Sequence, residues 1–133
     1  MPSVTKLVLP WPDKALSPNS RSHWAPRSTA VKASRNTAYI VCMAEMRQTF
    51  TDWDKLLKAR PDDHIKVSLT FEPPARYRYD MDNLVARMKS SLDGIADAIG
   101  VDDYCFWLER PQVGPVHKPK GRVLVTLELQ TDD

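Results

Sequence analysis

The sequence predicts a small α/β domain with a mixed sheet of about four strands and two main helices. Apolar and polar residues alternate in 64–72 and again in 122–130, as they do in strands that bury one face. Apolar residues recur at helical spacing in 28–50 and in 83–99, as they do in helices that bury one side. At 133 residues, the chain has the length of one domain, 1–133, with one core.

The N-terminal part is expected to hold one strand, one loop and one helix. Alternation from Val4 to Leu9 predicts the strand. Residues 10–27 hold four of the eleven prolines and several basic residues, which predicts a proline-rich basic loop without regular structure. The inner face of the helix over 28–50 should carry Val31, Ala38, Cys42 and Met46. A short turn or helix is expected at 53–59.

The second helix follows the strand at 64–72. Its apolar residues fall within an arc of about 120°, the width of a core-facing stripe, and are Leu84, Val85, Met88, Leu92, Ile95, Ala96 and Ile99. Asp82 or Asn83 is expected to cap its N-terminus, and Gly100 to end it. Further along, a strand is expected over 105–113, a basic turn over 114–121 and a final strand over 122–130.

Two acidic clusters bracket this helix, Asp80-Met81-Asp82-Asn83 at its start and Asp102-Asp103 at its end. Neighbouring carboxylates repel one another unless a cation lies between them. Mg²⁺ takes one or two carboxylates, keeps several waters, and binds substrate phosphate oxygens. If an extended backbone continues after Pro73-Pro74, Asp80 and Asp82 point to the same side. With Arg76 and Arg78 just upstream, this pattern is typical of a metal-dependent nuclease that acts on a polyanion.

Each cluster also has a purely structural interpretation. An Asp-x-Asp sequence before a helix can act as an ordinary cap, and Asp102-Asp103 can be a solvated turn. Lys89 lies just beyond the edge of the apolar stripe, where it can form an exposed i,i+4 pair with Asp93.

These residues together resemble one known family. Asp80-x-Asp82-Asn83-Leu84, then Lys89-x-x-x-Asp93, then Asp102-Asp103 after a glycine are similar to the RusA family of Holliday-junction resolvases, common in bacteria and their phages. The match covers Arg76 to Phe106, with weaker support from Leu9-Pro10-Trp11-Pro12. The resemblance implies a RusA-like, dimeric fold. It assigns metal-binding catalytic roles to Asp80, Asp82 and Asp103, and an essential role to Lys89.

The chain departs from the family pattern at two positions. The family lysine usually comes three residues after the asparagine, where this chain has Ala86, so Lys89 aligns through the shared Lys-x-x-x-Asp step. A basic residue often precedes the first aspartate, where this chain has Tyr79. One phosphate contact is therefore missing or displaced to Arg78.

The function implied by the resemblance is a Mg²⁺-dependent endodeoxyribonuclease that resolves four-way DNA junctions. One or two Mg²⁺ ions are expected, with Mn²⁺ as a substitute. Resolution requires two symmetric cuts, which a homodimer supplies. The alternatives are a less selective flap or single-strand nuclease with the same site, and a non-catalytic DNA-binding accessory protein.

Basic residues gather in the N-terminal segment. From Lys6 to Arg35 the chain has six basic residues and one acidic residue, a local balance of 6 − 1 = +5. Such a surface is the electrostatic footprint of phosphate binding, although a merely solvated basic face is the alternative. The residues expected to contact DNA are Arg21, Arg27, Arg76, Arg78, Lys118, Lys120 and Arg122.

Cysteine usage and hydropathy favour a cytoplasmic protein, in a bacterial cell or a phage-infected host. The two cysteines, Cys42 and Cys105, lack the spacing of a zinc site and are expected to be buried thiols. We see no signal-like N-terminus, and no apolar run approaches the length of a membrane helix. No membrane partner is expected.

The helix length creates a distance problem for the predicted site. A straight helix over 83–99 is about 24 Å long, whereas the four residues from Gly100 to Asp103 reach back only about 13 Å. Asp103 would then miss Asp80 and Asp82 of its own chain. We therefore expect Asp103 to come from the partner subunit, and the alternative is a helix that breaks near Gly94.

Overall fold

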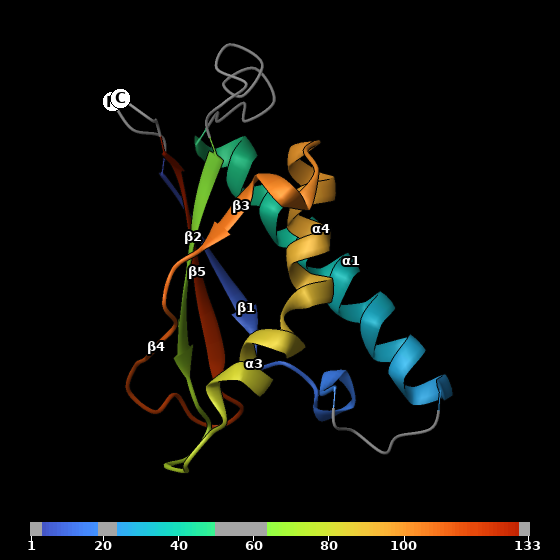
Figure 1. Cartoon of the computed structure of the whole chain (residues 1–133), viewed down its shortest axis with the longest axis vertical. Coiled ribbons are helices and arrows are strands. Elements are labelled where there is room, and N and C mark those ends of the chain that lie inside the picture. Colours follow the sequence, from blue (N-terminus) through green and yellow to red (C-terminus); the bar gives the residue numbers. More distant parts are fainter. Residues whose placement is uncertain (1–3, 19–23, 50–63, 131–133) are drawn as a thin grey trace.

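A mixed five-stranded sheet carries two long helices on one of its faces (Figure 1). This computed structural model describes residues 4–18, 24–49 and 64–130. The strand order is β1-β5-β2-β3, and β4 also pairs with β2. The strands are β1 (Val4–Pro10), β2 (His64–Glu72), β3 (Phe106–Leu108), β4 (Gln112–Val113) and β5 (Arg122–Gln130). The predicted α/β class and mixed sheet are confirmed.

The three long strands follow the alternation seen in the sequence. β5 runs antiparallel to both β1 and β2, so that Leu7 is opposite Val125, and Ile65 is opposite Leu129. Inward-facing residues of β2, from Ile65 to Phe71, are at most 2% exposed. Each of these strands was predicted within one residue of its observed bounds, because burial of one face imposes a period of two.

The single strand predicted over 105–113 is wrong. Two short strands, β3 and β4, pair in parallel with β2 instead. Between them, the backbone N–H of Glu109 still donates to the carbonyl of Val67 at 2.9 Å. Pro111 has no N–H to donate, and ladder pairing resumes only at Gln112, opposite Thr70.

Three α-helices lie within the described residues: α1 (Trp24–Thr49), α3 (Met81–Arg87) and α4 (Lys89–Ile99). Two short 3₁₀ helices accompany them, η1 (Lys14–Leu16) and η2 (Asp103–Cys105). The loop predicted over 10–27 therefore contains η1, which Asp13 caps by accepting from the N–H of Ala15 at 2.8 Å, and the start of α1. Residues 19–23 and the turn predicted at 53–59 lie outside the described residues.

The inner face of α1 differs from the prediction at one position. Ala38 and Cys42 are fully buried and Met46 packs against the core, as expected. Val31 is 36% exposed, whereas Ala30 is buried. The buried row advances in steps of four residues and therefore reaches Ala30 rather than Val31 at its N-terminal end.

The predicted single helix over 83–99 is broken, and not at the glycine. Met88 ends α3 and begins α4 with φ −86° and ψ −3°. Its N–H donates to the carbonyl of Val85 at 3.0 Å, and its own carbonyl accepts from Leu92 at 2.9 Å. Any residue can adopt this backbone conformation, so no glycine or proline marks the break. α4 runs unbroken through Gly94 and ends at Gly100, as predicted.

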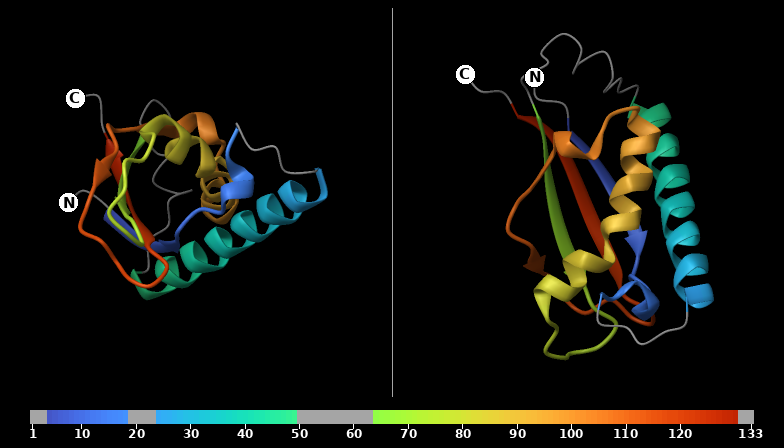
Figure 2. Two further views of the ribbon diagram at one scale, coloured as in Figure 1. Left: turned by 90° about the horizontal axis from the view of Figure 1, so that it is seen from below. Right: turned by 45° about the vertical axis from the view of Figure 1, so that its right-hand side comes forward.

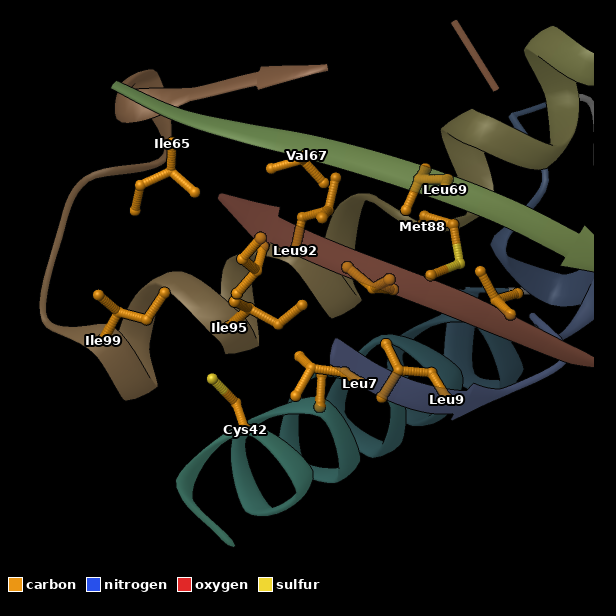
Figure 3. Packing of buried hydrophobic residues seen from close by; sticks show 14 of the residues in the cluster. Leu7, Leu9, Cys42, Ile65, Val67, Leu69, Met88, Leu92, Ile95 and Ile99 are labelled. Carbon is orange, nitrogen blue, oxygen red and sulfur yellow. The ribbon is translucent and has the colours of Figure 1, made fainter. Parts of the chain in front are cut away.

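The core fills the space between the sheet and the helices. Figure 3 shows Leu92 and Ile95 of α4 facing Val67 of β2 and Leu7 of β1, with Cys42 of α1 at the same layer. Burial of the Cys42 thiol, with a smaller effect from Glu45, raises its pKa to about 11. The prediction of a buried thiol is confirmed at Cys42, whereas Cys105 is partly buried.

Gly94 allows α4 to lie directly against α1 (Figure 2). A Cβ atom at Gly94 would overlap the backbone carbonyl of Arg35 and lie 3.2 Å from the Cβ of Ala38. The obstacle is backbone, which cannot rotate away as a flexible side chain can. No helix in the described part of the chain is both long and apolar enough to cross a membrane.

We predict that Gly94→Ala destabilises the protein. Alanine in an unobstructed helix is better than glycine by about 0.5–1 kcal/mol, but overpacking against the Arg35 carbonyl should cost about 1–3 kcal/mol. Urea denaturation measures the difference. Ala98→Gly, on the same helix, is the control. It should lose about 1 kcal/mol of helix propensity and the packing of one partly buried methyl group, because Ala98 lies against the core. A more stable Gly94→Ala protein would contradict the close packing.

Candidate functional site

The acidic residues predicted as one site fall into two groups within a single chain. Asp80 lines a hollow of about 810 Å³ together with Tyr77, Tyr79 and Arg78, which we call the tyrosine hollow. Asp102 and Asp103 line a different hollow of about 370 Å³ together with Lys89, Asp93, Arg35 and Asp97, which we call the lysine hollow. The chain passes from the first hollow to the second through the break at Met88.

Asp80 is the cap of α3. Its backbone is extended, with φ −72° and ψ 109°, and its carboxylate accepts from the N–H of Asn83 at 3.2 Å. Asp82 lies in the first turn of α3 and is exposed. The two carboxylates therefore do not lie on a strand, as the sequence interpretation assumed, and neither Asp82 nor Asn83 is the cap. A negative charge at a helix N-terminus is favourable.

Asn83 connects α3 to the N-terminal segment. Its side-chain N–H donates to the hydroxyl of Ser17 at 2.6 Å, and its carbonyl oxygen accepts from Arg87 at 2.9 Å. The carbonyl of Ser17 in turn accepts from Arg27 at 3.0 Å. The bond to Asn83 joins residues 66 positions apart, so sequence spacing gave no sign of it. Arg27, predicted to contact DNA, is held by this connection.

The tyrosine hollow is lined by more cations than anions. Lys14, Arg78, Arg87 and Lys120 line it together with two carboxylates, Asp13 and Asp80. Sequence analysis selected Arg78 and Lys120 as DNA contacts but missed Lys14 and Arg87, because these come from η1 and from the far end of α3. The balance is four positive and two negative side chains, which favours an anionic ligand.

The remaining residues predicted to bind DNA have different surroundings. Arg76 lines a neighbouring hollow of about 360 Å³. Arg122 donates to Glu72 at 2.5 Å, and the Glu72 side chain is only 9% exposed, so Arg122 neutralises a nearly buried carboxylate. Lys118 is exposed in the turn before β5. Arg21 lies outside the described residues.

Lys89 bridges two carboxylates of the lysine hollow. Its ammonium group donates to Asp103 at 2.5 Å and to Asp93 at 3.1 Å. The predicted i,i+4 pair with Asp93 is therefore present, and Asp103 joins it from 14 positions away. The Lys89 side chain remains 65% exposed.

Two carboxylates of this hollow have their own cations. The hydrogen bond from Lys89 lowers the pKa of Asp103, and the bond from Arg35, at 2.7 Å, lowers the pKa of Asp97. A depressed carboxyl pKa stabilises the folded state at neutral pH. That contribution disappears as the pH falls through the folded-state pKa, which lies below the ordinary value of 3.8. The pKa of Lys89 is raised, chiefly by Asp103 and then by Asp93.

Within the described part of one chain, the predicted metal ligands do not form a site of three side chains. Among the residues that the structure describes, no three His, Cys, Asp or Glu side chains gather closely enough to hold a metal ion. The residues predicted to bind Mg²⁺ are divided, because Asp80 lines the tyrosine hollow and Asp103 pairs with Lys89 in the other.

No family model matches the chain. An uncharacterized protein of Xylella fastidiosa (strain Temecula1 / ATCC 700964) is 39% identical over 124 residues, which are 93% of this chain and 76% of that protein. The chain belongs to the same family as this Xylella protein. Because the identity covers nearly the whole chain, the relationship to the Xylella protein extends over the fold and is not limited to one motif.

We predict that the two ion pairs of the lysine hollow titrate independently. Lys89→Gln should raise the pKa of Asp103 and leave that of Asp97 unchanged, because each carboxyl has its own main donor. Arg35→Gln should have the opposite pattern and is the matched control. Carboxyl ¹³C NMR over an acidic pH series measures both values. An Asp103 pKa that does not respond to Lys89→Gln would show that the contact is absent in solution.

Proposed function

We propose that the protein is a Mg²⁺-dependent endodeoxyribonuclease that cuts branched DNA, with four-way junctions as its preferred substrate. The contact between Lys89 and Asp103 at 2.5 Å is the observation that carries this proposal. The RusA resemblance gives both residues to one site, although 14 positions separate them in the chain. The fold brings them together beside Asp93, the other end of the Lys-x-x-x-Asp step.

Binding of the DNA backbone is proposed for the tyrosine hollow and its surroundings. Arg78, Arg87, Lys14 and Lys120 lie around Asp80, so a phosphate in this hollow would meet cations near the first catalytic aspartate. Cations and anions side by side suit a nuclease, because the cations hold the phosphates while the carboxylates hold a metal.

The catalytic site is proposed to form between two subunits. Asp80 and Asp82 of one chain would meet Asp103 and Lys89 of its partner, so that a two-fold dimer has two such sites. A site shared between subunits would bring together the carboxylates that lie in two separate hollows of a single chain. Together these aspartates would hold Mg²⁺, or Mn²⁺ in its place, which when bound supplies an activated water and stabilises charge on the leaving oxygen. Lys89 would leave Asp103 and neutralise the scissile phosphate.

Subunit mixing tests the shared site. Asp80→Asn and Asp103→Asn should each abolish Mg²⁺-dependent cleavage of a labelled four-way junction, with binding retained, because removing a negative charge does not weaken phosphate contacts. Mixed together, the two variants should regenerate one intact site in each heterodimer, which nicks the junction without resolving it.

The control mixture is Asp80→Asn with Asp82→Asn. Each site takes Asp80 and Asp82 from the same chain. In this heterodimer one site lacks Asp80 and the other lacks Asp82, so neither site is intact and the mixture should stay inactive. If the first mixture is also inactive although subunit exchange is verified, the site is built within one chain. Absence of Mg²⁺-dependent cleavage by the unmodified protein would favour a DNA-binding accessory protein.

The lysine has a separate test. Lys89→Ala should reduce junction cleavage at least about 100-fold while leaving binding within a few-fold, as expected for a group that acts on the reacting phosphate. Lys66→Ala is the control, because Lys66 also has a carboxylate partner, Glu128 at 3.8 Å, but lies on the sheet. Single-turnover rates on junction and on linear duplex of the same sequence measure both effects. Equal losses for the two variants would assign Lys89 to an ordinary surface pair.

A further inference from the structure

The exposed ring of Tyr77 is connected to the protein core through a series of packed aromatic rings. Tyr77 lies in the connection between β2 and α3 and is 78% exposed. This connection forms the lower tip of the molecule in Figure 1. The Tyr77 ring packs edge-on against Tyr79, with centroids 5.3 Å apart, and Tyr79 packs in the same way against Trp11 at 5.3 Å. Trp11 packs edge-on against the fully buried Phe71, with ring centroids 6.0 Å apart. Four rings therefore form a continuous ladder from the core to solvent.

The backbone that carries Tyr77 is also fixed. The hydroxyl of Tyr79 donates to the carbonyl of Ala75 at 3.2 Å, which closes the turn around Tyr77. Pro73 and Pro74 precede this turn, and proline restricts the backbone. The exposed ring thus loses little conformational freedom when a ligand covers it, which is the property of an aromatic binding platform.

Tyr77 lines two hollows. One is the tyrosine hollow, of about 810 Å³, with Arg78 among its cations. The other is the hollow of about 360 Å³, where Arg76 accompanies apolar residues that include Pro73 and Val113. Both volumes are within the range of about 300–1,000 Å³ typical of small-molecule sites. Both hollows that Tyr77 lines therefore offer an arginine and space for a flat group.

We propose that Tyr77 stacks on the base of an unpaired nucleotide, with Arg76 and Arg78 bound to the flanking phosphates. A flat ring beside cations suits single-stranded DNA, whose bases expose their faces while the backbone stays anionic. Bases within a duplex are already stacked on one another and cannot use the platform. This inference rests on the proposed function and names the part of branched DNA that the tyrosine hollow binds, the unpaired nucleotides at the branch.

Binding without cleavage tests the platform. The probe is a single-stranded oligothymidylate with one central 2-aminopurine, in EDTA, read by anisotropy of an end label and by 2-aminopurine quenching. Tyr77→Ala should weaken binding about tenfold and relieve the quenching, because stacking is worth about 1–3 kcal/mol per base. Tyr77→Phe should retain both signals.

Two further variants separate stacking from charge and from general exposure. Tyr39→Ala removes a ring that is 40% exposed but lies on α1 and lines neither of the two hollows beside Tyr77, and it should bind like the unmodified protein. Arg78→Ala should reduce the salt dependence of log affinity by about 0.7, whereas Tyr77→Ala should leave that slope unchanged. Thermal unfolding confirms that each variant is folded.

The outcomes distinguish this inference from the proposed function. The stacking proposal is overturned if the affinity of Tyr77→Ala stays within about twofold of the unmodified protein, or if Tyr39→Ala loses as much affinity, whatever the cleavage assay gives. Loss of binding to blunt duplex equal to the loss of single-strand binding also overturns it. A different outcome is that Tyr77→Ala loses only single-strand affinity and 2-aminopurine quenching while neither the unmodified protein nor any variant shows Mg²⁺-dependent cleavage. That result would support base stacking on Tyr77 and contradict the nuclease proposal.

Discussion

The bend at Met88 is the constraint from which the arrangement of both hollows follows. α3 must stay beside η1, because Asn83 donates to Ser17 at 2.6 Å. α4 must lie along α1, because Gly94 allows contact with the backbone of Arg35 and because Arg35 also pairs with Asp97. One straight helix cannot satisfy both requirements. The chain therefore turns at a residue that is itself 1% exposed, so that the apolar stripe stays continuous through the turn.

The charged contacts of the lysine hollow contribute little to the fold, and this bears on their use. Lys89 and Asp103 have side chains that are 65% and 50% exposed, and exposed ion pairs add little to stability. Exchanging Asp103 for a phosphate would therefore cost Lys89 little. Arg122 and Glu72 differ, because the Glu72 side chain is 9% exposed and would be left without its cation if Arg122 moved to bind DNA. Arg122 is thus poorly available for DNA.

Most of the fold could be predicted from sequence, because burial imposes periods that are visible in the residues. In the middle of β2 and β5, buried residues alternate with less buried ones, and the apolar residues from Leu84 to Ile99 form one stripe whether or not the helix bends. The bend itself could not be predicted, since the competing contacts of α3 and α4 involve distant residues. Pro111 is the sequence signal for the interruption between β3 and β4, because proline has no N–H to donate to the ladder.

The candidate site was less predictable than the fold. The acidic residues and Lys89 could be selected from their types and spacing, but the contact between Lys89 and Asp103 depends on the return of the chain after Gly100, which has φ 83°. The aromatic ladder from Phe71 to Tyr77 combines the residue that follows β1, the strand β2 and the β2–α3 connection. No local pattern relates those three segments, so only the folded chain brings their rings together.

Tyr77 and Asp80 line the same hollow, so base stacking on Tyr77 and cleavage at Asp80 must be compatible in space. If an unpaired base stacks on Tyr77, a phosphate close to that base lies near Asp80, and cleavage would occur beside the unpaired nucleotide. The partner's Asp103 and Lys89 would then have to reach this hollow from outside. Lys89 begins α4 and η2 carries Asp103, so the dimer interface would have to include the exposed surface that these two elements share. A dimer that buried the outer face of the sheet instead would keep the two groups of carboxylates apart, and would be incompatible with a shared site.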